Sequence, residues 1–497
     1  MNRGNLVDEY NVEPFTIQIF DGHSIKSFEK EYVPSYGQEK SRNVILFEKI
    51  KTETINRLKT TQIIPKILKL EELSVIVDTI IEKIVTDYRI DKNAAIQRVI
   101  RYQILGFTKI LPLLLDHQIE EIYLDNPQTA IYVDHAHWGR CRTPIFLSTD
   151  ELSQLITRAR IEGNAPLNRA NPSLKTDLVT QDFTARISID IAPIVVNGLH
   201  VDIRKLSTNP RTLESLIQNQ TLNSMVAAYL VFLLYHRCNI AVIGEPGAGK
   251  TTFMNALDLL TPYHWRKITI EDIIESVDQS KLGFHQVRFK VDPLEKDRKS
   301  STKSQEIIKL LHRSPDWVYF GEIQTEEQTQ ALFHALTTGL KGIFSFHATS
   351  PEHLVIRSAA HYKIPSISLH ALDVIIHVQK TWIQNKMRRQ ISRITEIGEL
   401  PKDRLSIGNP NTTVELIDTF RFHPGHGKLE SLTDLFFTPT LERIKKEVYL
   451  DEGAFSNKLQ MLSTMISSTS TLTPPHKHIP NEPAMLSQQI LEIIHSS

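Results

Sequence analysis

The sequence predicts an α/β protein in which a helical segment and a small α+β domain precede a larger domain built on a parallel sheet. Length is the first observation, because 497 residues at roughly 150 residues per domain correspond to about three domains. The second is a composition of 41% hydrophobic and 23% charged residues, which is that of a folded protein with a core. The third is the spacing of apolar residues, which changes along the chain from a helical period to a strand period and then to an alternation of both.

The first 206 residues are expected to form three regions. Residues 1–42 are polar and aperiodic, so they are expected to be a flexible lead. Between 43 and 110 apolar residues recur three and four positions apart, as in Leu73, Ile76 and Ile80, which predicts a helical subdomain of three amphipathic helices. Between 111 and 206 the period shortens toward two, as in Arg186–Ile191, with a helical interval near 151–161, and this predicts a small α+β domain.

The rest of the chain is expected to hold a larger domain and a tail. The stretch Thr208–Thr212, with the sequence TNPRT, has the composition of a linker, which we place at 207–221. Strand-like and helix-like segments then alternate over 222–440, as expected for a parallel sheet covered by helices. A helix near 441–450 is followed by residues rich in Ser, Thr and Pro, so the region 441–497 is expected to be helical at first and then a flexible tail.

Charge and composition exclude several classes of protein. The 57 Lys and Arg residues are balanced by 57 Asp and Glu residues, so the chain as a whole has no charge that attracts nucleic acid or anionic lipid. The longest apolar run, Met225–Tyr235, is too short for a membrane-spanning helix, and the N-terminal residues show no secretory signal. Cys141 and Cys238 can build neither a disulfide framework nor a four-cysteine zinc site, so a cytoplasmic setting without zinc is expected.

One motif carries specific chemistry. The segment Gly244–Thr251 fits the pattern G-x-x-x-x-G-K-[ST], and it lies between the apolar run Ile240–Ile243 and a predicted helix over 251–259. In this order of strand, loop and helix, backbone N–H groups hold phosphate oxygens, the Lys reaches the β- and γ-phosphates and the hydroxyl binds Mg²⁺. The motif therefore predicts a site for a nucleoside triphosphate and Mg²⁺, with Thr251 as a metal ligand. The residues expected to line this site are Gly244, Glu245, Pro246, Gly247, Ala248, Gly249, Lys250, Thr251 and Thr252.

Two acidic residues and one histidine are candidates for hydrolysis, which needs an acid on a neighbouring strand to orient the attacking water. Glu322 lies at the end of the apolar run that begins at Trp317, where ligands of parallel sheets collect, and it is expected to reach the metal through water. Glu271 follows a second apolar segment, and His347 follows a third. Their positions after successive strands indicate that all three side chains face one site.

These segments, in this order, resemble the secretion ATPase superfamily that powers type II secretion, type IV pili and archaella and, more distantly, type IV secretion. Four segments resemble its Walker A motif, acid box, Walker B region and histidine box: Gly244–Thr251, Ile268–Glu275, Leu311–Ile323 and Ser345–Thr349. Upstream, Asp182–Arg186 and Val201–Lys205 resemble N-domain segments whose arginines reach a bound nucleotide. The likeness spans roughly residues 95 to 400, and the lack of a four-cysteine zinc module favours the archaeal pilus or archaellum assembly ATPases.

The resemblance implies a fold, an activity and partners. The fold is a RecA-like P-loop NTPase domain preceded by the helical segment and the α+β N-domain, and the activity is Mg²⁺-dependent hydrolysis of ATP to ADP and phosphate. The enzyme would be a homohexameric ring in the cytoplasm, recruited to the cytoplasmic membrane by a multispanning inner-membrane platform protein. It would power the assembly or secretion of type IV pilus-like filaments and act indirectly on prepilin-like subunits, with no stable binding of nucleic acid.

The resemblance also assigns roles to five catalytic candidates. Glu322 positions or deprotonates the attacking water, Glu271 supports the metal or the water, and His347 senses the γ-phosphate. Arg186 and Arg204 neutralise the charge that develops in the transition state, which is the role of an arginine finger. For each arginine, an ion pair at the protein surface is the alternative.

Two other functions are compatible with the sequence. The basic residues between Arg288 and Lys303 give slight support to a related ring in DNA transfer or uptake, although acidic residues in the same stretch are typical of a solvated loop. A nucleotide-binding scaffold that does not hydrolyse ATP is suggested by Gln324 and Thr325, because members of the superfamily commonly have Arg-Asp or Arg-Gly at this point. A salt-dependent shift of DNA would support the first function, and tight ATP binding without phosphate release would support the second.

Overall fold

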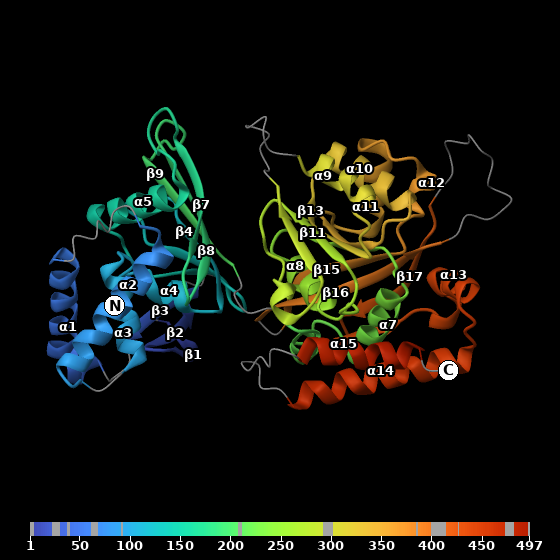
Figure 1. Ribbon diagram of the computed structural model, residues 1–497, viewed down its shortest axis with the longest axis horizontal. Helices are drawn as coiled ribbons and strands as arrows, with labels where there is room; N and C mark the ends of the chain where they lie inside the picture. Colours follow the sequence, from blue (N-terminus) through green and yellow to red (C-terminus); the bar gives the residue numbers. More distant parts are fainter. Residues whose placement is uncertain are drawn as a thin grey trace. The chain divides into compact units, whose positions relative to one another are not determined.

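The computed structural model describes residues 4–21, 30–36, 40–60, 68–90, 93–206, 211–291, 302–383, 386–398, 414–425, 427–472 and 482–495. Contacts within the chain divide it into two compact units (Figure 1). Unit 1 comprises residues 1–208 together with 383–387, and unit 2 comprises residues 209–382 together with 388–497. The boundary falls inside the region 207–221, where the sequence predicts a linker, although residues 207–210 themselves lie outside the described ranges.

Unit 1 contains a sheet of nine described strands in the order β1-β2-β3-β6-β5-β4-β9-β8-β7. Neighbouring strands run antiparallel except β3 and β6, which pair in parallel over two residues. In β8 the residues Ala185, Ile187 and Ile189 are buried on one face, so Arg186 points to the other. The strands are β1 (Leu6–Val12), β2 (Phe15–Asp21), β3 (Lys30–Tyr36), β4 (Ile119–Leu124), β5 (Tyr132–His135), β6 (Gly139–Arg142), β7 (Ser173–Val179), β8 (Thr184–Ile191) and β9 (Leu199–Leu206).

The helices of unit 1 share one apolar core with the sheet. The three helices that the sequence predicts between 43 and 105 are present as α1 to α3. Val77 and Val99 on these helices belong to the same buried cluster as Ile122 and Ile187 on the strands, so the structure joins the two regions that the sequence separates at residue 110. The described helices are α1 (Lys40–Thr60), α2 (Leu70–Asp87), α3 (Ala94–Ile104), α4 (Leu111–Leu115) and α5 (Thr149–Gly163).

The expectation of a flexible lead over residues 1–42 is wrong for the part of it that the structure describes. β1, β2 and β3 form an antiparallel meander within it. Apolar residues of β2 alternate with less buried neighbours and lie in the core, which is the period of a strand with one covered face. The hydroxyls of Tyr10 and Tyr32 donate to Asp116 Oδ2 at 2.6 and 2.8 Å, and these hydrogen bonds attach the meander to the rest of unit 1.

Unit 2 contains a second sheet, with the described strands in the order β12-β11-β13-β14-β10-β15-β16-β17-β18. The neighbours from β12 to β15 pair in parallel, whereas β16, β17 and β18 pair antiparallel. The predicted α/β class, with a parallel sheet in the larger domain, is confirmed. The strands are β10 (Ile240–Ile243), β11 (Lys267–Glu271), β12 (Gln286–Lys290), β13 (Trp317–Ile323), β14 (Gly342–Phe346), β15 (Val374–Ile383), β16 (Lys386–Ile397), β17 (Leu416–His423) and β18 (Lys428–Ser431).

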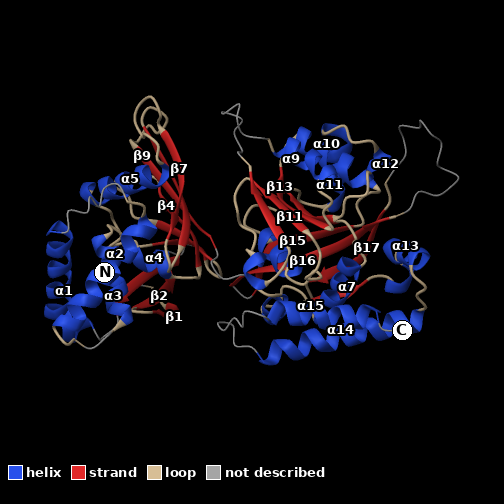
Figure 2. Ribbon diagram, viewed as in Figure 1, coloured by secondary structure: helices blue, strands red, loops and turns tan. Residues whose placement is uncertain are grey.

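Helices cover both faces of this sheet (Figure 2). Successive residues of the short central strand β10 contribute to different cores, because Ile240 and Val242 belong to one buried cluster and Ala241 and Ile243 to the other. The first cluster includes residues of α6, α7, α8 and α13 to α15, and the second includes residues of α9 to α12. The helices are α6 (Leu213–Gln218), α7 (Ser224–Tyr235), α8 (Lys250–Asp258), α9 (Lys303–Lys309), α10 (Glu326–Thr337), α11 (Pro351–Ile356), α12 (Ser366–Leu369), α13 (Pro439–Glu447), α14 (Glu452–Leu472) and α15 (Glu482–His495).

The expectation of a flexible tail is wrong for α14 and α15. Ile466 and Ile490 on these helices are buried in the core shared with α7, which therefore extends beyond residue 440. Ser and Thr residues are tolerated within a helix when the hydroxyl bonds to a carbonyl of the preceding turn, as Thr464 Oγ1 does to Gln460 O at 2.8 Å. Residues 474 and 475, the two adjacent prolines that follow α14, lie outside the described residues. None of the helices that the structure describes combines the length and apolar character needed to cross a bilayer.

Candidate functional site

The carboxyl ends of four parallel strands lie side by side at one edge of the unit 2 sheet. β10 leads into the glycine-rich loop, β11 ends at Glu271, Glu322 is near the end of β13, and His347 directly follows β14. The four strands are consecutive neighbours in the order β11-β13-β14-β10 and run parallel. The structure therefore brings the predicted loop, both acids and the histidine to the edge where parallel sheets bind their ligands.

The glycine-rich loop connects β10 to the first turn of α8, where Thr251 and Thr252 lie. Gly249 precedes this helix with a φ of 97°, a conformation that residues with a side chain rarely adopt. Lys250 Nζ donates to the carbonyl oxygens of Gly244 and Glu245 at 2.9 and 3.1 Å. The lysine ammonium is thus held by carbonyl groups of the loop, and phosphate oxygens would compete with these carbonyls for it.

A chain of contacts joins Lys250 to Glu322 through His347. Lys250 Nζ lies 3.1 Å from His347 Nδ1, and because an ammonium group only donates, Nδ1 accepts and the ring proton lies on Nε2. His347 Nε2 contacts Glu322 Oε1. Burial lowers the pKa of His347; Glu322 opposes this effect and Lys250 adds to it. A neutral imidazole therefore connects the glycine-rich loop with the carboxylate at the end of β13.

Glu271 is buried, with 1% of its surface exposed. It accepts hydrogen bonds from Ser276 N at 3.1 Å, from Ser276 Oγ at 2.5 Å and from Glu275 N at 3.2 Å, so it fixes the loop that follows β11. Burial raises the pKa of Glu271 to about 7 in spite of these bonds. Gly321 leaves room for this side chain, since a Cβ at position 321 would lie 3.1 Å from Glu271 Cγ.

Lys303 is a residue of this site that sequence reasoning missed. It begins α9, is 3% exposed, and donates through Nζ to the main-chain oxygen of Glu322. Its Nζ also lies 3.3 Å from Asp272 Oδ2, and burial lowers the pKa of Lys303. The cation offsets the negative charge of the acids around it. Its only signal in the sequence is membership of a stretch of mixed charge, which does not distinguish it from the other lysines there.

Arg186 and Arg204 lie in unit 1, in register on the neighbouring strands β8 and β9. Arg186 Nε is 2.8 Å from Asp177 Oδ1 on β7, and Arg204 Nε is 3.0 Å from Glu121 Oε1 on β4. The four residues are register partners across β7, β8, β9 and β4, so they form a charged row on the sheet in which the two arginines are neighbours and an acid lies at each end. Each arginine thus forms an ion pair, which the sequence analysis gives as the alternative to a role as an arginine finger. Their action on a nucleotide stays a prediction.

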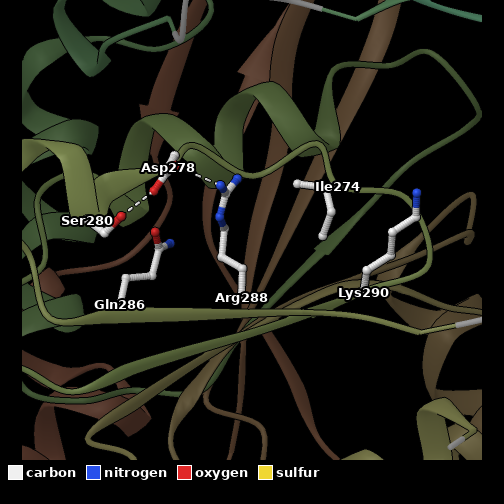
Figure 3. Close-up of a pocket in the computed structure, with 6 residues that line it drawn as sticks. All are labelled: Ile274, Asp278, Ser280, Gln286, Arg288 and Lys290. Carbon is white, nitrogen blue, oxygen red and sulfur yellow. Dashed lines mark hydrogen bonds and ion pairs between the residues drawn. The ribbon is translucent and has the colours of Figure 1, made fainter. Parts of the chain in front are cut away.

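A cavity of about 330 Å³ lies beside β12 and the loop that follows β11 (Figure 3). Asp278 accepts a hydrogen bond from Ser280 Oγ at 2.5 Å and pairs with Arg288 Nη2 at 2.8 Å within its wall. None of the residues predicted for the nucleotide site lines this cavity. Its lining consists of Ile274, Asp278, Ser280, Gln286, Arg288 and Lys290.

The oxygen donors of Thr251 and Glu322 suit Mg²⁺ better than a transition metal. Mg²⁺ keeps several waters and takes substrate phosphates as ligands, so one hydroxyl and one carboxylate are a sufficient protein contribution. Among the described residues, no group of three or more His, Cys, Asp or Glu side chains is placed to hold a metal ion. Cys141 and Cys238 are both buried free thiols.

A parallel sheet with a glycine-rich loop between strand and helix, and with acids at the ends of adjacent strands, is the arrangement of a P-loop nucleotide-binding domain. Residues 104–380, more than half of the chain, match the family model of type II/IV secretion system proteins. The chain belongs to this family of secretion ATPases. The resemblance that the sequence motifs predict is thereby confirmed at the level of the family.

Similar proteins come from archaea and bacteria. The uncharacterised protein MJ0781 of Methanocaldococcus jannaschii is 29% identical over 253 residues, which cover 49% of this chain and 34% of the relative, so the match spans about a third of that protein's length. The type IV secretion system protein VirB11 of Brucella abortus is 25% identical over 345 residues, covering 62% of this chain and 93% of VirB11. The crystal structure of the VirB11 ATPase from Brucella suis with sulphate is 24% identical and covers 61% of this chain and 96% of that one, with a TM-score of 0.29.

Proposed function

We propose that the chain is a Mg²⁺-dependent ATPase that works as a homohexameric ring and powers the assembly or secretion of a type IV pilus-like filament. The observation that supports this most is the chain of contacts from Lys250 through His347 to Glu322. Hydrolysis requires that the group that binds phosphate and the group that orients water lie next to each other. In unit 2 these two groups are connected by a single imidazole ring.

The residues of unit 2 have distinct roles in the proposed reaction. Lys250 leaves the carbonyl oxygens of the loop and binds the β- and γ-phosphates, and His347, which contacts both Lys250 and Glu322, senses the change. Glu322 orients the attacking water and accepts its proton. Mg²⁺, held by Thr251 and through water by Glu322, would neutralise charge on the phosphates. Glu271 supports the site by holding the loop after β11.

The role of unit 1 and the partners of the ring are proposed by analogy with the family. Arg186 and Arg204 are proposed to neutralise the charge that develops on the transferred phosphoryl group. The ring is proposed to act in the cytoplasm, where a multispanning platform protein of the inner membrane recruits it and prepilin-like subunits receive its work indirectly. Light scattering with and without nucleotide tests the ring, and a strict monomer at micromolar concentration under both conditions would contradict it.

Phosphate release in the presence of Mg²⁺ tests the assignment of the site. Glu322→Gln keeps the shape of the side chain but removes the base, so kcat should fall by roughly 10²-fold or more while ATP still binds. Lys250→Ala should abolish ATP binding as well. Glu326→Gln is the matched control, because Glu326 lies at the start of α10 and pairs with Lys363 at 2.9 Å. Full Mg²⁺-dependent activity in either site variant would mean that the site lies elsewhere.

A DNA-transfer or uptake ATPase is a second candidate, because type IV secretion proteins are among the similar proteins. The basic stretch expected to support it falls mostly on residues 292–301, outside the described part of the chain. A DNA shift that weakens with salt, and that is lost when these basic residues are replaced, would favour this function.

A non-hydrolysing scaffold is the third candidate. Gln324, one of the two residues that depart from the superfamily pattern, donates through Nε2 to Glu322 Oε2 at 2.8 Å, so the departure touches the proposed base itself. Tight ATP binding by the wild-type chain without any phosphate release would favour the scaffold over the enzyme.

A further inference from the structure

Two basic side chains from the neighbouring strands β15 and β16 lie against the glycine-rich loop. Arg389 Nε on β16 donates to the carbonyl oxygen of Gly247 at 3.0 Å. The aliphatic part of Arg389 passes Gly249, where its Cδ is 3.0 Å from the position that a Cβ would occupy. Lys380 Nζ on β15 lies 2.8 Å from the corresponding position at Gly247. The absence of side chains at these two glycines thus allows two cations to approach the loop.

The hydrogen bond from Arg389 determines the direction of one peptide group of the loop. In a planar trans peptide the C=O group and the following N–H group point in opposite directions. Because the Gly247 carbonyl faces Arg389, the N–H of Ala248 faces away from it, where it donates to Glu245 O at 3.2 Å. The same Glu245 oxygen accepts from Lys250 Nζ at 3.1 Å. Arg389 therefore keeps the Ala248 N–H on the side of the loop where Lys250 lies.

The neighbouring residue Arg388 shows that this contact is specific to one arginine of the basic stretch 386–393. Successive residues of a strand point to opposite faces of the sheet. Arg388 accordingly bonds through Nη1 to Gln220 Oε1 rather than to the loop. The two arginines have the same chemistry and adjacent positions but different partners, which makes Arg388 a matched control.

We propose that Arg389 is a positioning residue of the nucleotide site, which directs the Ala248 N–H at a bound phosphate, and that Lys380 adds positive charge beside Gly247. This inference rests on the proposed function, since it concerns the same loop. A phosphate oxygen would replace the Glu245 carbonyl as the acceptor of the Ala248 N–H. The guanidinium on the Gly247 carbonyl polarises the peptide, which makes this N–H a stronger donor. Arg389 therefore contributes to affinity for the phosphates of the nucleotide.

Nucleotide affinity and steady-state kinetics of Arg389→Ala, Arg389→Lys and Arg388→Ala test the inference in the intact chain. Arg389→Ala should raise Kd for ATP and ADP, and KM for ATP, by roughly tenfold, as expected for the loss of one charge-assisted hydrogen bond. Its kcat at saturating ATP should stay within about twofold of wild type, because the residue acts on binding. Arg389→Lys should restore part of the affinity, and Arg388→Ala should bind as wild type does.

The outcomes separate this inference from the proposed function. Wild-type KM and Kd in Arg389→Ala would overturn the inference and leave the proposed function standing. A lower Tm of Arg389→Ala with unchanged KM would also overturn it, because it would show a purely structural role. If wild-type protein and Arg388→Ala neither bind nor hydrolyse ATP, the proposed function itself fails.

Discussion

Glu271 should make the stability of the protein depend on pH, and its replacement by Gln tests this dependence. Burial raises the pKa of this carboxyl from 4.5 in the unfolded chain to about 7 in the folded protein. Between these two pH values the folded protein keeps a proton on Glu271 that the unfolded chain has lost. The stability associated with the neutral carboxyl is therefore complete below pH 4.5, decreases as the pH rises, and is lost above about pH 7.

The size of the effect follows from the same two pKa values. At about 1.36 kcal/mol per pKa unit, a rise from 4.5 to about 7 corresponds to about 3 kcal/mol of unfolding free energy. Solvent screens this effect little, because Glu271 is only 1% exposed. Gln does not ionise, and its amide oxygen can still accept from Ser276 N and Glu275 N. Glu271→Gln should therefore be close to wild type in stability at pH 5 and more stable at pH 8, by roughly 5 to 10 °C in Tm.

Thermal unfolding of wild type and Glu271→Gln between pH 5 and 8.5, without nucleotide, measures this difference. Ser276→Ala provides a second test, because it removes the hydroxyl that donates to the Glu271 carboxylate at 2.5 Å. That bond lowers the pKa of Glu271, so its loss should move the midpoint of the pH dependence to a higher pH. A Tm difference between Glu271→Gln and wild type that stays constant over this pH range would refute the reasoning.

Two further predictions concern buried polar groups. Lys303→Met leaves the Asp272 carboxylate without the cation that lies 3.3 Å away, and should lower the unfolding free energy by about 3 to 5 kcal/mol. In urea unfolding of the intact protein, adding Asp272→Asn should restore part of this loss, and no restoration would contradict the pairing. Tyr32→Phe removes a hydroxyl that donates to buried Asp116 at 2.8 Å, and should lower stability by about 1 to 3 kcal/mol. Tyr36→Phe, at a residue that is 37% exposed, should lower Tm less, and an equal loss in both variants would contradict the prediction.

The elements that carry the candidate site could be predicted from the sequence because their signals are local. The run Ile240–Ile243, the glycine motif and the following helix are contiguous, and the structure has them as β10, the loop and α8. Glu271, Glu322 and His347 each follow an apolar segment, and parallel strands necessarily end at one edge of a sheet. Their proximity therefore follows once the sheet is known to be parallel.

The parts that could not be predicted depend on contacts between residues far apart in the sequence. Arg389 bonds to a loop residue 142 positions earlier, and Lys303 meets an acid 31 positions earlier, so no local pattern marks either residue. In the meander, β2 alternates clearly, but β1 and β3 on either side of it alternate only weakly. Tyr32 on β3 bonds to Asp116, 84 positions later, so this contact also has no local signal. In α14, the Ser and Thr hydroxyl groups that led to the prediction of a flexible tail bond to the helix backbone instead.

The two arginines expected to act on the nucleotide differ in the free energy needed to release them from their present partners. Arg186 is 9% exposed, pairs with Asp177 at 2.8 Å, and has a buried Nη1 with no hydrogen-bond partner among the described residues. Separating a buried ion pair leaves uncompensated charge and costs about 3 to 5 kcal/mol. Arg204 is 47% exposed, and pairs of this kind contribute at most about 1 kcal/mol. A contact with the transition state has to form and break in every cycle, so Arg204 is the better candidate for an arginine finger, whereas Arg186 is better suited to holding the charged row on the sheet.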